Sequence, residues 1–162
     1  MTASTTPKIS VLVPCYNVAH FVAECLMSLK VQTLNDIEVI CLNDGSTDNT
    51  LALIRETVAD DPRFRIVDKP NSGYGATMNL GLKMARGEYI GIVESDDFVE
   101  KTMFEKLYSV AVEHELDIAR CCFNTLLDGR VKPNRCHFLP KDLTVDPKVA
   151  DNVFRPVSYT HL

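Results

Sequence analysis

The sequence predicts an α/β protein built on a mostly parallel β-sheet with helices on both faces. Short apolar runs alternate with segments of helical spacing between residues 8 and 115, which is typical of parallel strands joined by helical crossovers. Polar clusters directly follow three of the apolar runs. Because ligands of such sheets bind beyond the carboxyl ends of the strands, these clusters predict a site at one edge of the sheet.

The first two strands come from residues 8–14 (KISVLVP) and 37–42 (IEVICL), which are continuous apolar runs typical of buried strands. Between them, apolar residues recur every three to four positions and predict a helix over residues 18–32. A second helix follows the second strand, with Asp48 as its N-cap.

The next two strands are expected at residues 64–67 and 89–93 (YIGIV). A glycine-rich loop at 71–75 leads into a helix that ends near Ala85. We expect Gly87 to end this helix in the left-handed conformation that glycine tolerates. Each of these two strands is thus expected to follow a helix and to extend the parallel sheet.

Past the fourth strand, residues 101–115 show helical spacing, and residues 117–123 are expected to form a fifth strand. The Asp128-Gly129 pair is a candidate hairpin turn. No convincing period follows Pro140, and the final residues 157–162 (VSYTHL) look foreign to the protein.

The composition is that of a soluble globular domain, with 46% hydrophobic and 24% charged residues among 162. A net charge of −5 argues against a protein that binds the phosphate backbone of nucleic acids, which would carry a basic face. The acidic net charge does not exclude a small phosphorylated ligand, because one metal ion can supply the positive charge that such a ligand needs. No signal peptide or membrane-length apolar run is recognisable, so we expect a cytoplasmic protein that reaches the inner face of a membrane only through regions not present here.

An acidic pair, Asp96 and Asp97, directly follows the fourth predicted strand. Adjacent carboxylates repel each other unless a cation or hydrogen bonds neutralise them, and carboxylate oxygens suit Mg²⁺ or Mn²⁺. The alternative is that Asp96 caps the helix beginning near Lys101 and that Asp97 is merely solvated.

Two further polar clusters follow the first and second strands. Within residues 43–46 (NDGS), Asp44 can accept a hydrogen bond from a nucleobase N–H. Tyr16 can stack on a base, and Asn17 can cap the first helix. Each has an ordinary alternative, a strand-to-helix turn for the first and a packed surface tyrosine for the second.

The loop at residues 71–75 (NSGYG) does not read G-x-G-x-x-G, and no Walker sequence occurs in the chain. These absences argue against a dinucleotide site of the Rossmann type and against a P-loop ATP site. The glycines either let the backbone approach a sugar or diphosphate, or simply make a turn.

Taken in order, these motifs resemble family-2 glycosyltransferases over residues 8–123. The resemblance rests on five segments: VLVPCYN at 11–17, NDGSTD at 43–48, NSG at 71–73 with NLGL at 79–82, ARGEYI at 85–90, and SDD at 95–97. It implies a GT-A (Rossmann-like) fold, incomplete at the C-terminus.

For domains, we expect a disordered N-terminus at 1–7 and the GT-A nucleotide-sugar-binding domain at 8–123. Residues 124–156 would begin an acceptor-side region, and residues 157–162 would be a non-native tail.

The resemblance also implies roles for individual residues. Pro14 and Tyr16 would line the base pocket, and Asp44 would hydrogen-bond the base. Asp96 would contact the ribose and diphosphate, and Asp97 would be the principal ligand of the divalent metal, with Asp96 beside it. The full expected nucleotide-sugar-binding set is Pro14, Tyr16, Asn17, Asp44, Ser72, Gly73, Asn79 and Asp96.

Three more positions bear on this assignment. Glu94 stands where many family members have Asp, so the acidic motif departs slightly from the family pattern. Lys83 and Arg86 are further candidates for neighbours of the diphosphate.

The implied reaction is attack of an acceptor hydroxyl on the anomeric carbon of a nucleotide-activated sugar, with inversion and with Mn²⁺ or Mg²⁺ as cofactor. A UDP-sugar is the expected donor, and a glycan or lipid-linked glycan the expected acceptor. The general base is expected beyond Leu162, so this chain alone would be inactive. Two alternatives stay open: a non-catalytic nucleotide-sugar-binding module and a nucleotidyltransferase-like α/β enzyme.

Overall fold

The computed structural model describes residues 6–127, 130–133 and 159–161. The expectations for most of the N-terminal segment 1–7, for much of 124–156 and for positions 157, 158 and 162 lie outside these residues.

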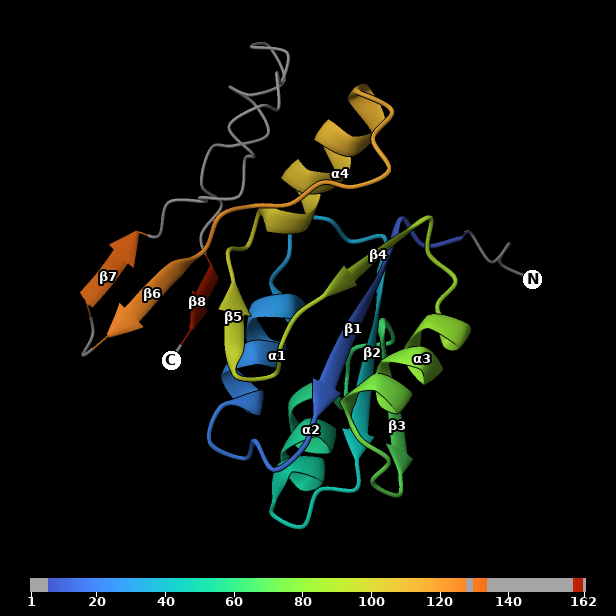
Figure 1. Ribbon diagram of the computed structural model, residues 1–162, viewed down its shortest axis with the longest axis vertical. Coiled ribbons are helices and arrows are strands. Elements are labelled where there is room, and N and C mark those ends of the chain that lie inside the picture. The colour runs from blue at the N-terminus through green and yellow to red at the C-terminus, as the bar shows by residue number, and fades with distance from the viewer. Residues whose placement is uncertain (1–5, 128–129, 134–158, 162) are drawn as a thin grey trace.

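The first sheet has four strands in the order β3-β2-β1-β4. These are β1 (Ile9–Cys15), β2 (Ile37–Asp44), β3 (Phe64–Lys69) and β4 (Tyr89–Ile92), and every pair is parallel. The arrowheads of β1, β2 and β3 point toward the same end of the molecule (Figure 1). The predicted parallel sheet is therefore confirmed, with strand bounds that differ by one or two residues.

The two central strands, β1 and β2, are buried at every position. Their continuous apolar sequences follow from this, because both faces of a parallel strand lie under helices. Pro14 fits within β1 because the oxygen of Leu12 accepts the N–H of Val93, and the β1–β4 pairing ends at Leu12. Backbone groups alternate sides along a strand, so the missing N–H of Pro14 faces the side where β4 has already left the sheet.

Helices cover both faces of the first sheet, as predicted. They are α1 (Val22–Lys30), α2 (Thr50–Val58), α3 (Tyr74–Met84) and α4 (Met103–Glu113). Apolar side chains of α1, α2 and α4 share one core cluster with β1 and β2. Met78 and Met84 of α3 pack on the other face, against Leu12 and Leu42. None of the helices in the described part of the chain has the length and apolarity needed to span a bilayer.

The helix α1 begins later than predicted, at Val22 rather than near Val18. The N–H of Val18 donates to the Thr50 hydroxyl at 2.8 Å, and the N–H of Ala19 donates to the Asp48 carboxylate at 3.2 Å. Side chains that precede and begin α2 therefore bind the backbone of this segment, which enters the helix only afterwards.

A second sheet has the strand order β5-β8-β6-β7. Its strands are β5 (Asp97–Val99), β6 (Asn124–Leu127), β7 (Arg130–Pro133) and β8 (Tyr159–His161). The antiparallel pairing of β6 and β7 brings Leu127 opposite Arg130, as the predicted hairpin requires, although its two turn residues lie outside the description. The short β8, which comes from the predicted tail 157–162, pairs with β5 and β6.

The predicted strand at residues 117–123 was wrong, because these residues have no regular secondary structure. Cys121 and Cys122 are buried there, whereas Ile118 is 81% exposed. An apolar composition without alternation had suggested a buried strand, but the segment buries only some of its apolar side chains along an irregular path.

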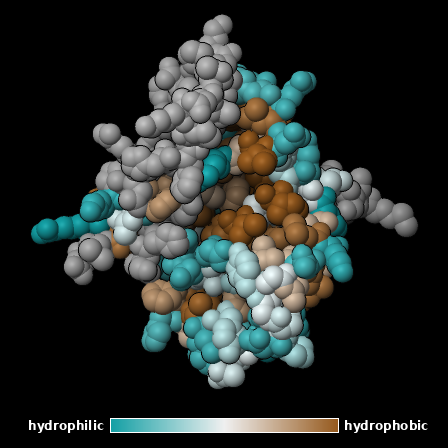
Figure 2. Space-filling view, viewed as in Figure 1, coloured by the Kyte–Doolittle hydropathy of each residue, from teal (hydrophilic) through white to brown (hydrophobic). Residues whose placement is uncertain are grey.

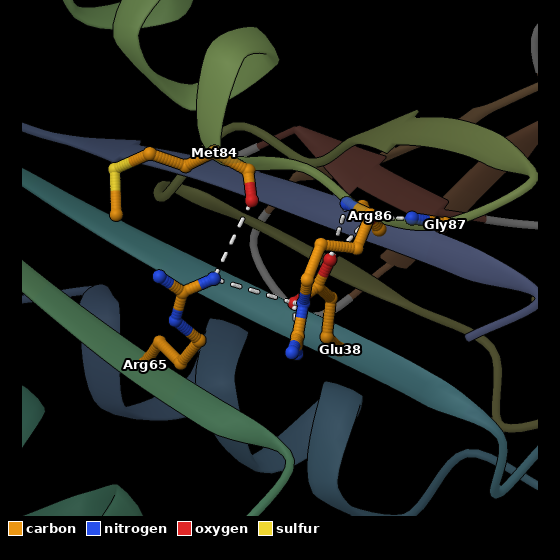
Figure 3. A network of polar contacts seen from close by, with 6 residues as sticks. Glu38, Arg65, Met84, Arg86 and Gly87 are labelled. Atoms are coloured by element: carbon orange, nitrogen blue, oxygen red, sulfur yellow. Dashed lines mark hydrogen bonds and ion pairs between the residues drawn. The ribbon is translucent and has the colours of Figure 1, made fainter. Parts of the chain in front are cut away.

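A polar network fixes the start of β4 at the amino edge of the first sheet (Figure 3). The buried carboxylate of Glu38 accepts the backbone N–H of Arg86 at 2.7 Å and its guanidinium at 2.8 Å. Arg86 was expected near a diphosphate at the other edge, so that expectation was wrong. Lys83 lies in the last turn of α3, toward the same amino edge.

Gly87 does not adopt the left-handed conformation predicted for it, since only Gly45 and Gly73 among the described glycines have positive φ. Its N–H donates to the Ser10 hydroxyl at 2.7 Å, and a Cβ atom at this position would lie 2.4 Å from the nitrogen of Ser10. The glycine is needed for close approach of two backbones and not for its φ angle.

Candidate functional site

Four loops leave the first sheet at its carboxyl edge, because all four strands are parallel. They are residues 16–21 after β1, 45–49 after β2, 70–73 after β3 and 93–96 after β4. We call this edge the strand-end rim. Five of the predicted binding residues lie in it: Tyr16, Asn17, Ser72, Gly73 and Asp96. The other four lie in neighbouring elements, with Pro14 in β1, Asp44 at the end of β2, Asn79 on α3 and Asp97 at the start of β5.

Asp44 is the last residue of β2 and is buried, with 4% of its surface exposed. Its Oδ1 atom accepts the N–H of Ser72 at 2.9 Å and the Lys69 ammonium. Burial alone would raise the pKa of this carboxyl, but the hydrogen bonds from Lys69 and from the N–H of Ser72 outweigh it, so the pKa is lowered. Asp44 is therefore an ionised acceptor at neutral pH.

Gly45 lets the loops after β2 and β3 lie against each other. Its φ angle is +67°, and a Cβ atom there would lie 2.6 Å from the nitrogen of Asn71. Both the backbone angle and the contact exclude a side chain at this position.

Asn17 joins the loops after β1 and β2. Its φ angle is +54°, a conformation that asparagine tolerates better than most residues. Its Oδ1 atom accepts the N–H of Thr47 at 2.8 Å, and its own N–H donates to the Ser46 hydroxyl at 3.1 Å. Asn17 therefore connects two loops, whereas the sequence suggested a cap of the first helix.

Asp48 was predicted as the N-cap of the second helix, but the N-cap of α2 is Asn49, one residue later. The Oδ1 atom of Asp48 still accepts the N–H of Thr50, the first residue of α2, at 2.9 Å. Its other carboxylate oxygen accepts the N–H of Ala19, so one side chain joins the start of α2 to the loop after β1.

The two residues expected at the base pocket differ in exposure. Pro14 is buried within β1, whereas Tyr16, two residues later, is 50% exposed. An aromatic ring that is half exposed beside a buried acceptor offers a flat apolar surface for stacking.

The acidic residues follow β4 in a tight turn, in which the N–H of Asp97 donates to the oxygen of Glu94 at 3.0 Å. Asp96 is exposed in this turn, and Asp97 is buried at the start of β5. Asp96 does not cap α4, which begins at Met103, so the alternative helix-cap interpretation of this residue fails.

Glu94 is held by the first residue of α3. The Tyr74 hydroxyl donates to its carboxylate at 2.7 Å, and this hydrogen bond raises the pKa of Tyr74 to about 12. The contact joins the turn after β4 to the loop after β3. Sequence reasoning missed it, because nothing in the spacing of a loop tyrosine and a strand-end glutamate indicates that they meet.

The remaining side of the rim is joined by Ser95 and Cys15. Burial raises the pKa of the Cys15 thiol to about 12, although a hydrogen bond with Ser95 acts in the opposite direction. The hydrogen bonds of Asn17, Asp44 and Tyr74 link the four loops in series, from the loop after β1 to the turn after β4. The polar segments that the sequence placed at one sheet edge are therefore connected to one another.

Of the other predicted residues, Ser72 and Gly73 lie in the rim, whereas Asn79 does not. Ser72 binds Asp44 and Lys69. Gly73, with φ of +84°, precedes α3 and is exposed. Asn79 is exposed on α3 itself, farther along the helix. Lys69 was missed by sequence reasoning; only the strand register, which sets it opposite Asp44, could have indicated its role.

Carboxylates at the rim provide the oxygen donors that Mg²⁺ and Mn²⁺ prefer. In the acidic turn, Asp96 is exposed and Glu94 is partly exposed, whereas Asp97 is 4% exposed. Within the described residues, no group of three or more His, Cys, Asp or Glu side chains gathers closely enough to hold a metal ion.

An apolar groove of about 800 Å³ runs between β4, α4 and residues 116–121, and Glu94 and Asp97 line part of it. Figure 2 shows apolar residues gathered around a hollow on this face of the molecule. The groove therefore adjoins the acidic turn, while Tyr16 and Asp44 lie outside it.

Comparison with known proteins identifies similar sequences and folds. The family model for glycosyl transferase family 2 matches residues 10–150. The uncharacterized glycosyltransferase EpsJ of Bacillus subtilis is 43% identical over 117 residues, which are 72% of this chain and 34% of EpsJ. The chain thus spans about a third of the length of this relative.

Two solved structures share the fold. S. aureus TarS 1–349 in complex with UDP-GlcNAc has a TM-score of 0.70 and 32% identity, over 79% of this chain and 37% of TarS. A mannosyltransferase from Pyrobaculum calidifontis in complex with GDP-Man and Mn²⁺ has a TM-score of 0.59 and 23% identity, over 75% of this chain and 36% of that protein. The predicted GT-A fold is confirmed by these similarities.

Proposed function

Since this chain belongs to glycosyl transferase family 2, we propose that its strand-end rim binds the nucleotide diphosphate of an activated sugar for transfer to an acceptor hydroxyl. The observation that carries the proposal is the series of hydrogen bonds that joins the four loops, which carry a buried acceptor, an exposed aromatic ring and an exposed carboxylate. The similarity to TarS, whose structure contains UDP-GlcNAc, supports a UDP-sugar as the donor.

At one side of the rim, Asp44 and Tyr16 would bind the base. The ionised Asp44 would accept a base N–H, and the half-exposed Tyr16 would stack on the ring. Pro14, which is buried one residue before the end of β1, would support the pocket from below. Asn17 would act by holding the loop that carries Tyr16.

At the other side, the acidic turn would hold Mn²⁺ or Mg²⁺. The exposed carboxylate of Asp96 favours it as the ligand that meets an ion from solvent, whereas the sequence predicted Asp97 as the principal ligand. Divalent ions of this kind take one or two protein carboxylates and complete their shell with phosphate and water. When bound, the metal would neutralise charge that develops on the departing diphosphate. Ser72, Gly73 and Asn79 would face the sugar and diphosphate.

The acceptor side is a further part of the proposal. We expect an inverting transfer to a glycan or lipid-linked glycan, in the setting of cell-surface polysaccharide synthesis at the inner face of the membrane. The general base remains predicted beyond Leu162. The chain by itself would then bind donor without transferring the sugar.

Calorimetry with UDP tests the donor site. We expect binding in the presence of Mn²⁺ that weakens at least about tenfold in EDTA, because the metal bridges carboxylate and diphosphate. Asp96→Asn should remove most of this metal effect, and Asp97→Asn should be compared with it. Asp60→Asn removes an exposed carboxylate from the opposite edge of the sheet and should bind like the unaltered chain.

Two results would count against the proposal. Wild-type affinity that is equal with Mn²⁺ and with EDTA would exclude a metal-dependent site. Metal dependence that survives in both Asp96→Asn and Asp97→Asn would mean that other residues hold the ion. Incubation with UTP and GlcNAc-1-phosphate adds a check on reaction class, because release of pyrophosphate from these substrates would instead indicate nucleotidyl transfer.

A further inference from the structure

We propose that Lys69 is a positioning residue for base recognition, and that it makes the site select nucleotides whose base presents an N–H donor to Asp44. This inference rests on the proposed nucleotide-binding function. Uracil and guanine present such a donor on the edge that would meet Asp44, whereas cytosine presents an acceptor nitrogen there. Lys69 would not touch the ligand but would act through the carboxylate that does.

The backbone brings the two side chains together. Lys69 and Asp44 are the last residues of the neighbouring parallel strands β3 and β2, and the strand register sets them opposite each other. Both side chains are largely shielded from solvent, with 14% of Lys69 and 6% of Asp44 exposed. Ion pairs shielded in this way are screened less by salt than exposed pairs.

All three N–H donors of the Lys69 ammonium have partners. Besides Asp44, they bond to the oxygen of Pro70 at 3.0 Å and to the Ser72 hydroxyl at 2.7 Å. A lysine carries three donors and no acceptor, so none is left for a ligand. The Lys69 ammonium therefore makes all its hydrogen bonds within the protein, to the Asp44 carboxylate and to the loop after β3.

These contacts leave one carboxylate oxygen for a base. Lys69 and the N–H of Ser72 both donate to the Oδ1 atom of Asp44, and Oδ2 accepts neither bond. An ionised carboxylate can only accept hydrogen bonds. A base with an N–H at this position donates a hydrogen bond to Oδ2. A base with an acceptor nitrogen there places its lone pair against a lone pair of Oδ2, and the two repel.

The ionised state of Asp44 depends on its surroundings. Lys69 is the charged group that acts on it from β3, the loop after β3 supplies the N–H of Ser72, and α3 supplies the uncharged hydroxyl of Thr77. Without the ammonium, burial would favour the protonated acid, which could donate a hydrogen bond to cytosine. Loss of Lys69 should therefore change which base is preferred, and should do so in a pH-dependent way.

The experiment compares UDP and CDP, each with Mn²⁺, by calorimetry on the full chain between pH 5.5 and 8. The affinity ratio of the two nucleotides is the readout, because protonation of the diphosphate affects both alike. We expect the unaltered chain to prefer UDP at least about tenfold, with a ratio constant over this range. In Lys69→Met the ratio should fall at least about fivefold and should fall further as the pH is lowered.

Two variants separate positioning from general damage. Lys69→Arg keeps the charge and should restore a ratio that does not change with pH. Lys30→Met removes a lysine that binds the oxygen of Thr57 at 2.9 Å, away from the rim, and should leave the ratio unchanged. Should Lys69→Met fail to fold by circular dichroism, Asp44→Asn still tests base selection, because an amide both donates and accepts and should reduce the ratio to near one.

The possible failures are distinguishable. If the unaltered chain binds neither UDP nor CDP, the proposed function itself fails. If it binds both equally, or if Asp44→Asn keeps the preference for UDP, base selection through Asp44 is wrong. If Lys69→Met keeps a constant, unreduced ratio, Asp44 selects the base without help from Lys69 and the positioning role is overturned.

Discussion

Glu38 collects donors from three segments that are far apart in the sequence. Its carboxylate accepts the Ser10 hydroxyl at 2.6 Å, the backbone N–H of Arg86 at 2.7 Å and the Arg86 guanidinium, with Arg65 3.5 Å away. The carboxylate itself is 4% exposed, although both arginines reach solvent. Replacing one carboxylate oxygen by an amide NH2 would set a donor against the buried Ser10 hydroxyl or the Arg86 donors, which is more harmful than loss of an exposed ion pair.

Glu38→Gln should therefore lower the free energy of unfolding by about 2 kcal/mol at pH 7. Burial alone would raise the pKa of Glu38, but hydrogen bonds from Ser10 and Arg86 outweigh it and lower the pKa. Stabilisation by a carboxyl with a lowered pKa is present above its unfolded value, about 4.3, and is lost as the pH falls through the folded value. Urea denaturation at pH 7 and pH 3.5 should thus show a smaller difference between variant and wild type at the lower pH.

The exposed Glu56→Gln on α2 serves as the control and should match wild type at both pH values. Equal stability of Glu38→Gln and wild type at pH 7 would show that the network adds nothing to folding.

Single residues differ in how far the sequence could place them. Asp44, Tyr16 and Asp96 were predictable because each follows an apolar run, and parallel strands end at one edge. Lys69 was not, because a lysine at a strand end usually reaches solvent, and its burial depends on a partner in another strand. Arg86 was misplaced for a similar reason, since its partner Glu38 lies 48 positions away.

Among the elements, the loop after β2 depends most on one conformation. Gly45→Ala should destabilise the protein by about 1–3 kcal/mol, because it places a Cβ atom 2.6 Å from Asn71 in a residue with positive φ. It should also weaken UDP binding, since it displaces the loop that carries Ser72. Gly75→Ala is the matched control, because no atom lies within 4 Å of its Cβ, and it should be neutral or slightly stabilising in thermal unfolding. Two variants of equal stability would remove the steric argument.

Element prediction succeeded where burial is continuous and failed where it is not. The strands β1 and β2 were found because both of their faces lie in the core, which forces an uninterrupted apolar run, whereas β3 and β4 are only partly buried and were found from shorter apolar runs. The strand predicted at 117–123 failed because apolar content was read as burial. The three-residue β5 was missed because it is too short to show a period and begins with the charged Asp97 of the acidic pair.

At the scale of the whole molecule, β1 and β2 lie at the centre of the first sheet, between two layers of helices. Their amides should exchange with deuterium only through global unfolding, at least about tenfold more slowly than those of β4. β4 is an edge strand of the first sheet, and its Ile90 and Ile92 are 42% and 53% exposed. Hydrogen exchange followed by mass spectrometry measures this directly; equal protection of β4 and β2 would contradict the layered description.

The global arrangement was predictable only in part. Alternation of strands and helices gave the parallel sheet and its two helical layers, because that sequence of elements admits few architectures. In the second sheet, β5 and β6 pair with β8, which lies some 30 to 60 positions later in the chain. A local sequence pattern cannot predict pairings between strands so far apart.

The contact of Gly87 with Ser10 has a consequence at the far end of β4. It locks the strand against β1 in a single alignment, with Tyr89 opposite Ile9. Successive side chains of a strand point to opposite faces, so a shift by one position would turn every following residue over. The outward Asp96 and the inward Asp97 would then exchange orientations, so the chain sets the direction of its acidic turn several residues before reaching it.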